Sequence, residues 1–404
     1  MFNIEKIRKD FPILSQKVNG KPNAFLDSAA SSQKPKCVID KISHIFQNQY
    51  ANVHRGSYHL SESITNEYEQ ARKTVQNFIS AASEKEIIFT RNATESINLV
   101  AATWGKKFLK KGDEVLISVA EHHANLIPWQ MLRDEIGITL KFFNLNDDGS
   151  FSGEEFEKAL SSKTKLVSIT AMSNVLGTIF PVKDIIKKAH QVGAKVLIDA
   201  CQYIVHHKIN VTELDCDFLV FSGHKLYGPT GIGVLYGKYN ILDSIPPYQT
   251  GGDMVDKVSF EKTTFAAPPA RFEAGTPAIV EAIGLSEAIR YLEEVGMENI
   301  STYEKELTAH TTQKLSEIKD LKIIGTAKDK GGIFSFVVEN IHPQDLAFIL
   351  DKEGVSIRTG HHCAEPLVNL YGHTSLARAS LGMYTTKADI DQLVAAINKA
   401  KTFF

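Results

Sequence analysis

DFLVFSGHKLYGPTGIGVLY, residues 217–236, places a lysine and a glycine-rich turn between two short apolar runs. The runs, DFLVFS (217–222) and GVLY (233–236), are typical of buried strands. Lys225 follows directly after the first run, at the strand end where open α/β sheets bind ligands. In a cleft, burial would lower the pKa of this lysine, and its neutral amine could form a Schiff base. A surface lysine in a turn is the plainer alternative.

The same kind of apolar run recurs towards the N-terminus. The further strand candidates are EIIFT (86–90), EVLIS (114–118), TLKFF (139–143), KLVSIT (165–170) and KVLIDA (195–200). Amphipathic stretches separate many of them, such as VKDIIKKAHQVG (182–193), and the apolar residues of 64–78 recur every three or four positions, as in a helix. Strands that alternate with helices predict an α/β fold with a mostly parallel, seven-stranded sheet covered on both faces.

The chain has 404 residues, which is too long for one compact core, so we expect two domains. Residues 238–275 are rich in Pro, Gly and aromatic side chains and predict an ordered loop or hairpin excursion. We expect an N-terminal segment (1–20) that packs on the smaller domain, a large domain (21–275), and a small α+β C-terminal domain (276–404).

The composition excludes several functional classes. The net charge is −2, and acidic and basic residues are mixed along the chain, so nucleic acid is not an expected partner. We find neither a signal peptide nor an apolar run long enough to cross a membrane. The four cysteines form no CxxC pair, which fits a reducing compartment and makes the cytoplasm the expected location.

Small or polar residues follow five of the predicted strands. In chain order they are Ala93 and Thr94, His122, Asn174, Asp199, and Ser222 and His224 beside Lys225. Each of these features also has a purely structural explanation when it is taken singly. Ala93 and Thr94 could begin a capped helix, His122 could be packed, Asn174 could stand in a turn, Asp199 could cap a helix, and Lys225 could lie on the surface. Together they supply a phosphate-binding helix start, a stacking imidazole, an amide, a carboxylate and an amine. That set of groups matches pyridoxal phosphate.

Cys363 lies in RTGHHCAEPL, residues 358–367, next to two histidines. Cys363 could be a metal ligand, a redox thiol, a nucleophile or a core residue. Consecutive residues rarely aim at one metal ion, so we expect no metal site. The surrounding arginine, glycine and histidines are typical of a polar loop, whereas Cys201 and Cys216 are better candidates for the core.

Several motifs carry a resemblance over essentially the whole chain. They include LDSAASSQKP (26–35), EHHANLIPWQ (121–130), RFEAGTP (271–277), RTGHHCAEPL and RASLGMYTT (378–386). The chain resembles the cysteine desulfurases of the group that includes SufS and CsdA, among the class V aminotransferase-like enzymes of the fold-type I pyridoxal phosphate transferases. The motif around Cys363 is the most diagnostic of these stretches.

The resemblance implies a role for each candidate residue. Lys225 would bind pyridoxal phosphate covalently, Asp199 would pair with its ring nitrogen, and His122 would stack on the ring. Gln202 and Asn174 would bond near the phenolate oxygen. The phosphate would be held by Ala93, Thr94, Ser222, His224 and, across the interface of a homodimer, Thr276.

On the substrate side, Arg378 would clamp the carboxylate of L-cysteine, with Asn174 and Arg358 nearby. Cys363 would take the sulfur as a persulfide and leave L-alanine, helped by positive or polar groups on Arg358, His361 and His362. The resemblance further implies iron–sulfur cluster assembly and a SufE-like or SufU-like acceptor. We also expect a mobile loop around Cys363.

Two other functions stay open from the sequence. A selenocysteine lyase or another class V enzyme, such as a kynureninase-like one, would use the same cofactor. A non-catalytic sulfur or metal carrier would use Cys363 with its histidines, but it would need neither Lys225 nor Asp199.

Overall fold

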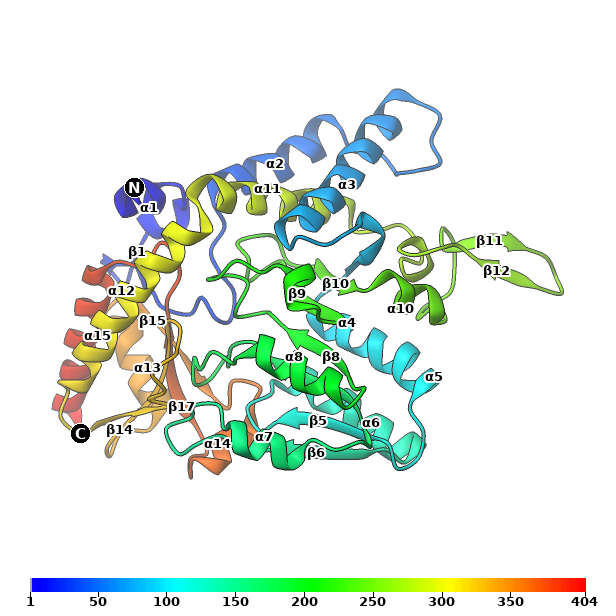
Figure 1. Cartoon of the computed structure of the whole chain (residues 1–404). Coiled ribbons are helices and arrows are strands. Elements are labelled where there is room, and N and C mark those ends of the chain that lie inside the picture. Colours follow the sequence, from blue (N-terminus) through cyan, green and yellow to red (C-terminus); the bar gives the residue numbers. More distant parts are fainter. Residues whose placement is uncertain (1) are drawn as a thin grey trace.

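The computed structural model describes residues 2–404 and contains two main β-sheets, with helices on both faces of the larger one (Figure 1). The larger sheet has seven strands in the order β4-β10-β9-β8-β7-β5-β6. Their bounds are β4 (Ile87–Thr90), β5 (Glu114–Ser118), β6 (Thr139–Phe143), β7 (Thr164–Thr170), β8 (Lys195–Asp199), β9 (Phe218–Ser222) and β10 (Gly233–Gly237). All seven coincide with the apolar runs singled out in the sequence.

The sheet is mostly parallel, as predicted. Strands β6, β5, β7, β8 and β9 pair in parallel, and β10 runs antiparallel to both β9 and β4. Parallel neighbours need crossover connections, which the intervening helices supply. The carboxyl ends of the parallel strands therefore meet at one edge of the sheet, and the residues that follow them come together there.

Alternate residues of each strand face opposite layers of helices. In β8, Val196 and Ile198 belong to the core that includes residues of α3 and α8, whereas Leu197 belongs to the core that includes residues of α4 and α6. The bounds of these helices are α3 (His59–Phe78), α8 (Val182–Gln191), α4 (Ala93–Val100) and α6 (Ile127–Ile136). A strand that is apolar on both sides can only lie inside such a three-layer arrangement, so the composition of these runs specifies the architecture.

The C-terminal part builds a second, antiparallel sheet in the order β13-β14-β17-β16. Its strands are β13 (Leu321–Ile324), β14 (Ile333–Val338), β16 (Arg358–Gly360) and β17 (Leu376–Ser380). Helices α12 (Met297–Ser316), α13 (Pro343–Lys352) and α15 (Lys387–Ala400) contribute to a separate core on this sheet. In β17, Ala377 and Ala379 face that core, so Arg378 projects from the opposite side.

The connections between the two parts bear on the predicted domains. Helix α11 (Ile279–Val295) packs on α3 and on α2 (Lys36–Asn48). At the N-terminus, Arg8 of α1 (Ile4–Lys9) binds Asp389 of α15 through both guanidinium nitrogens (2.8 and 3.1 Å). The boundaries at residues 20 and 275 remain predictions.

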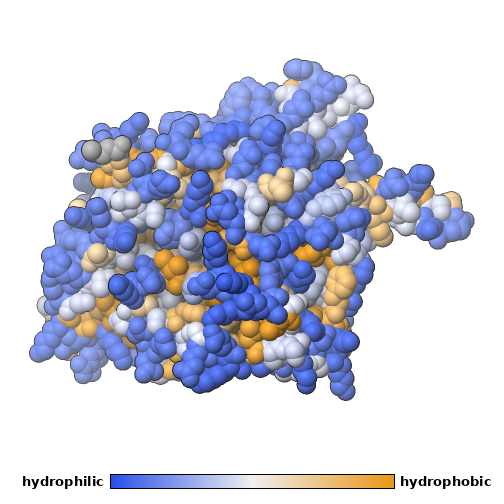
Figure 2. Space-filling view, viewed as in Figure 1, coloured by the Kyte–Doolittle hydropathy of each residue, from blue (hydrophilic) through white to orange (hydrophobic). Residues whose placement is uncertain are grey.

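The expected excursion of residues 238–275 contains α10 (Tyr239–Ser244) and a hairpin of β11 (Val255–Val258) and β12 (Thr263–Phe265), which projects from the body in Figure 1. The remaining short elements are β1 (Lys17–Val18), β2 (Lys21–Pro22), β3 (Ala24–Phe25), β15 (Val355–Ser356), α5 (Lys106–Phe108), α7 (Gly153–Ala159), α9 (Val211–Leu214) and α14 (Glu365–Leu370). Polar residues cover most of this face of the molecule (Figure 2). Within residues 2–404, no helix has the length and apolar composition that crossing a membrane requires.

A buried ion pair joins α3 to the first strand of the large sheet. Arg72 is 3% exposed, and it donates to both oxygens of Glu273 (2.7 and 2.9 Å) and to the carbonyl of Ile87 (3.0 Å). Glu273 in turn accepts from the backbone N–H of Phe89 (2.7 Å). Each charge thus has its partner, and neither could remain buried alone.

We predict that Arg72→Met lowers the free energy of unfolding by about 3–5 kcal/mol, because it leaves the carboxylate of Glu273 buried without its cation. Denaturant unfolding followed by circular dichroism measures the loss. Lys158→Met is the control, since Lys158 forms its ion pair with Glu154 on the exposed surface. Equal stability of Arg72→Met and wild type would contradict the role given to this pair.

Candidate active site

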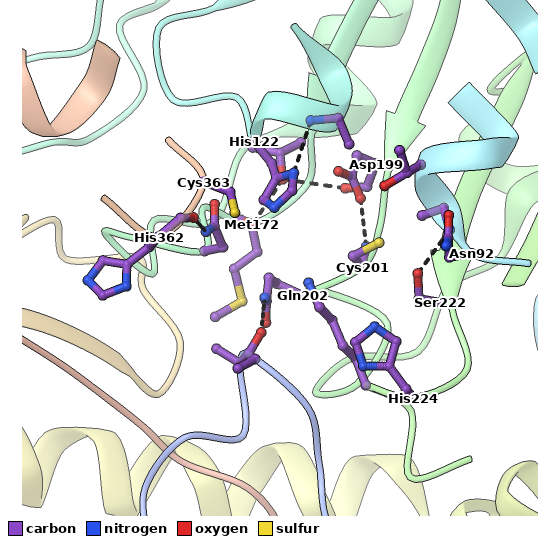
Figure 3. Close-up of a pocket in the computed structure, with 18 of the residues that line it drawn as sticks. Asn92, His122, Met172, Asp199, Cys201, Gln202, Ser222, His224, His362 and Cys363 are labelled. Carbon is purple, nitrogen blue, oxygen red and sulfur yellow. Dashed lines mark hydrogen bonds between the residues drawn. The ribbon is translucent and has the colours of Figure 1, made fainter. Parts of the chain in front are cut away.

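A cavity of about 240 Å³ lies at the carboxyl edge of the large sheet (Figure 3). With the exception of Thr276, every candidate site residue lines it: Ala93, Thr94, His122, Asn174, Asp199, Gln202, Ser222, His224, Lys225, Arg358, Cys363 and Arg378. The first nine end or follow strands of the large sheet, and the last three come from the C-terminal part. The cavity therefore combines residues from segments far apart in the sequence.

The carboxylate of Asp199 suits the ring nitrogen of pyridoxal phosphate. Asp199 ends β8 and is 5% exposed, and its Oδ1 accepts from the backbone N–H of Cys201 (3.0 Å). A buried carboxylate at the end of a parallel strand suits a pyridinium N–H, which can donate a hydrogen bond to it.

The start of α4 suits the phosphate group. The side chain of Asn92 caps this helix by accepting from the N–H of Glu95 (2.9 Å), and the N–H of Ala93 donates to the hydroxyl of Ser222 (2.9 Å). Ser222 ends β9, so this bond holds the helix start against the strand. Ala93 and Thr94 line the cavity at this helix start, where the hydroxyl and N–H of Thr94 can bind an anion.

Gly233 of β10 permits this close packing. A Cβ at this position would lie 2.5 Å from the Cα and 2.6 Å from the carbonyl carbon of Asn92. Only a residue without a side chain lets the strand approach the start of α4 so closely. The last glycine of the TGIG turn therefore has a packing role that affects the phosphate-binding end of α4.

Two histidines of the cavity are uncharged near neutral pH. Burial, followed by the charge of Lys225, lowers the pKa of His122 to about 4 and that of His224 to about 4. The Nδ1 atom of His122 accepts from the N–H of Ala124 (3.0 Å), so its proton lies on Nε2. Figure 3 shows His122 beside both Asp199 and Cys363.

Arg378 and Arg358 are directly paired residues of β17 and β16. Like charges in this arrangement repel, and Asp27 neutralises them: its Oδ1 lies 3.3 Å from Arg378 and its Oδ2 lies 3.2 Å from Arg358. Arg378 is 2% exposed and also donates to the carbonyl of Asn174 (2.9 Å). Two guanidinium groups with one shared counter-ion leave a positive charge that suits a substrate carboxylate.

All four cysteines lie within the described residues, and Cys363 is the exposed one. Cys201 and Cys216 are buried, as expected from the sequence. Burial raises the pKa of Cys37 to about 11 and that of Cys216 to about 12, and it also raises the pKa of Cys201. These three thiols stay protonated near neutral pH, which leaves Cys363 as the accessible thiol at the cavity.

Cations near Cys363 come from the arginines rather than from His362. Burial, followed by the charge of Arg378, lowers the pKa of His362 to about 3. His362 is therefore a neutral neighbour of the thiol at physiological pH, whereas Arg358 and Arg378 are cations that line the same cavity.

The two amide side chains have protein partners in this structure. Asn174 donates through Nδ2 to the carbonyl of His362 (2.7 Å), and Gln202 donates through Nε2 to the carbonyl of Ala29 (2.8 Å). Their bonds near the phenolate oxygen remain predictions. Thr276 lines a different cavity of about 270 Å³, together with Tyr68 and Arg91, so its contact with the phosphate also remains a prediction.

Some residues of the site were missed by reasoning from sequence. Asn92, Met172 and Cys201 line the cavity, and Asp27 and Glu121 lie behind it. Glu121 is 3% exposed and contacts Ser118 Oγ (2.5 Å), Asn125 Nδ2 (2.7 Å) and Thr170 N (2.9 Å). The signal available in the sequence was an acidic residue shortly after a buried strand and directly before His122.

Known proteins are similar to this chain over most of its length. A family model described as Aminotransferase class-V matches residues 24–393. A cysteine desulfurase from Synechococcus elongatus is 48% identical over 401 residues, which cover 99% of this chain and 64% of that protein. A probable cysteine desulfurase from Synechocystis sp. is also 48% identical, and the match covers 98% of this chain and 96% of that protein. The crystal structure of the cysteine desulfurase CsdA from Escherichia coli aligns with a TM-score of 0.93 and 35% identity, over 100% of both chains.

We predict that the free energy of unfolding of Glu121→Gln, taken relative to that of wild type, increases as the pH rises from about 5 to 8. Burial raises the pKa of Glu121 from its ordinary value to about 8, so in this window the folded state holds a proton that the unfolded state releases. Wild-type stability should then fall with pH by at most about 1.4 kcal/mol per pH unit at this site. Denaturant unfolding at several pH values measures the difference between the variants.

Glutamine cannot titrate, and its amide can replace a protonated carboxyl among Ser118, Asn125 and Thr170. Glu293→Gln, at an exposed position of α11, is the control. A difference between Glu121→Gln and wild type that stays constant with pH would show that Glu121 is ionised in the folded protein.

We predict that Gly233→Ala loses about 1–3 kcal/mol of stability and binds pyridoxal phosphate more weakly, because the new Cβ pushes Asn92 and the start of α4 away from β10. Absorbance of the bound cofactor during dialysis measures its retention. Gly153→Ala is the control, since the nearest atom to its added Cβ is 3.8 Å away. Cofactor retention equal to that of wild type would contradict the packing role of Gly233.

Proposed function

We infer that this chain, which belongs to the class-V aminotransferase family, is one of its pyridoxal-phosphate-dependent cysteine desulfurases, and we propose that Cys363 is the sulfur acceptor. One observation carries the proposal: Lys225, Asp199, Arg378 and the exposed thiol of Cys363 line the same cavity. A lysine and a buried aspartate suit the cofactor, an arginine suits an amino-acid carboxylate, and an exposed thiol suits sulfur transfer.

Lys225 and Asp199 serve the cofactor. Within the described part of the chain, no acceptor binds Nζ of Lys225, so this amine is available for the aldehyde of pyridoxal phosphate and, later, for moving the α-proton of the substrate. The negative charge of Asp199 favours a protonated ring nitrogen. When bound, pyridoxal phosphate withdraws electrons from the Cα of the amino acid and so weakens the bond between Cβ and sulfur.

Arg378 and Arg358 hold the substrate by its carboxylate. A guanidinium fork binds both carboxylate oxygens and restrains the orientation of the amino acid, which a lysine in its place would not do. Because Arg378 is buried and bound to Asp27 and to the carbonyl of Asn174, its position is already set before the substrate arrives. The cost of orienting the substrate is thereby reduced.

Cys363 completes the reaction with L-cysteine. Its thiolate attacks the substrate sulfur, a bond between the two sulfur atoms forms, and the bond from Cβ to sulfur breaks. The electron pair of the broken bond stays on the carbon side and is protonated at Cβ, which yields L-alanine. One cysteine and one thiol thus become one alanine and one persulfide on Cys363, with no external oxidant or reductant.

Three finer assignments belong to the same proposal. The persulfide on Cys363 passes to an acceptor protein of the SufE-like or SufU-like kind for iron–sulfur cluster assembly, which the exposure of Cys363 supports. The active unit is a homodimer in which Thr276 completes the partner's phosphate site. The protein works in the cytoplasm, which its four free cysteines support.

We predict that wild-type protein with bound pyridoxal phosphate, L-cysteine and a reductant forms alanine and sulfide in equal amounts. Cys363→Ala should lose both products by about a hundredfold or more, because the step that breaks the carbon–sulfur bond lacks its nucleophile. Amino-acid analysis and a sulfide assay of the same samples give both quantities. Cys37→Ala is the control, since Cys37 is half-buried on α2 and lies outside the cavity.

The other outcomes separate the alternatives. Full activity of Cys363→Ala on cysteine would replace sulfur transfer by direct elimination and would make a selenocysteine lyase the better assignment. Bound cofactor without alanine formation in the wild type would overturn the choice of substrate.

A further inference from the structure

The backbone around Cys363 has an unusual conformation. His362 and Cys363 have φ angles of 52° and 55°, so two consecutive residues with side chains occupy the left-handed region. Such residues persist in this region only where surrounding contacts hold them. The segment 361–365, which we call the cysteine segment, is therefore under strain that its neighbours must balance.

Residues in the loops that follow β5 and β7 contact the cysteine segment on both sides of the thiol. The backbone N–H of His123 donates to the carbonyl of Cys363 (2.7 Å), and Nδ2 of Asn174 donates to the carbonyl of His362 (2.7 Å). The ring of His123 makes a third contact, because its Nε2 accepts from the N–H of Glu365 (3.1 Å). Two of the three contacts come from His123.

The ring contact defines the state of His123. An Nε2 atom that accepts a hydrogen bond carries no proton, so the ring is neutral with its proton on Nδ1. This is the opposite tautomer to that of the neighbouring His122, whose Nδ1 is the acceptor. The two adjacent histidines therefore have different positions: His122 lines the cavity, and His123 contacts the cysteine segment.

We propose that His123 is a positioning residue for sulfur transfer, whose neutral ring holds the cysteine segment so that the thiol of Cys363 stays at the cavity. The inference rests on the proposed function, since it concerns the same thiol. Without the acceptor at Nε2, the N–H of Glu365 is free to find water, and the left-handed backbone at His362 and Cys363 can relax. The thiol would then spend less time in line with the substrate sulfur.

Two substitutions of His123 isolate the acceptor. His123→Phe keeps a ring of similar size and the backbone N–H, but it removes the acceptor. His123→Gln offers a side-chain oxygen at about the reach of Nε2 and so restores the acceptor. Both are compared with wild type as holoenzymes, and thermal unfolding shows that each variant is folded.

The first readout is single-turnover formation of alanine from L-cysteine without reductant, which reports the transfer of sulfur to Cys363. We expect a fall of about tenfold to a hundredfold in His123→Phe, the effect of a misplaced reacting group, and a rate near that of wild type in His123→Gln. Exchange of the α-proton of L-alanine in deuterated water needs Lys225 and the cofactor but not Cys363. This exchange should be unchanged in both variants.

The second readout does not depend on activity. Hydrogen exchange of peptides covering residues 361–368 should be faster in His123→Phe than in wild type, because the N–H of Glu365 has lost its acceptor. In His123→Gln the side-chain oxygen replaces this acceptor, so the exchange should be as slow as in wild type.

Three results would overturn the proposal: a wild-type alanine rate in His123→Phe, a loss in His123→Gln as large as in His123→Phe, or equal hydrogen exchange in all three proteins. If wild type formed no alanine, the proposed function would fall, and the hydrogen-exchange comparison would still decide whether His123 holds the cysteine segment.

Discussion

The buried guanidinium of Arg378 joins the second sheet to the loop that follows β7 and to Asp27, and the geometry of the cavity depends on it. A charge that is 2% exposed must be paired, and Arg378 meets this need with Asp27 and with the carbonyl of Asn174. The side chain of Asn174 in turn holds the carbonyl of His362, next to Cys363. A series of contacts thus leads from Arg378 through Asn174 to the residue before Cys363, and it links the C-terminal part to a loop of the large sheet.

The charges of the cavity follow from burial. His122, His224 and His362 all have a lowered pKa, because each is buried and lies near Lys225 or Arg378. Because these imidazoles are neutral, the positive charge of the cavity comes from Lys225, Arg358 and Arg378, which would suit an anionic ligand. A neutral imidazole near Asp199 also does not compete with the ring nitrogen of a cofactor for this carboxylate.

Much of the site could be predicted because apolar strands end where the polar residues begin. KVLID ends at Asp199, and DFLVFS ends at Ser222, so the pattern of residues alone places each motif at the carboxyl edge of a parallel sheet. Asp27 and His123 could not be assigned in this way. Asp27 acts on arginines more than 300 positions away, and His123 acts on the N–H of Glu365, 242 positions away.

The sequence by itself determined the α/β class, the seven strands and the set of groups that suit pyridoxal phosphate. It could do so because side-chain periodicity and short motifs are local properties, which can be recognised in a few consecutive residues without the rest of the chain. Only the tertiary structure decided that His123 contacts the cysteine segment and that Asp27 neutralises the paired arginines. These properties depend on burial and on contacts between distant segments, and both arise only when the second sheet packs against the edge of the first.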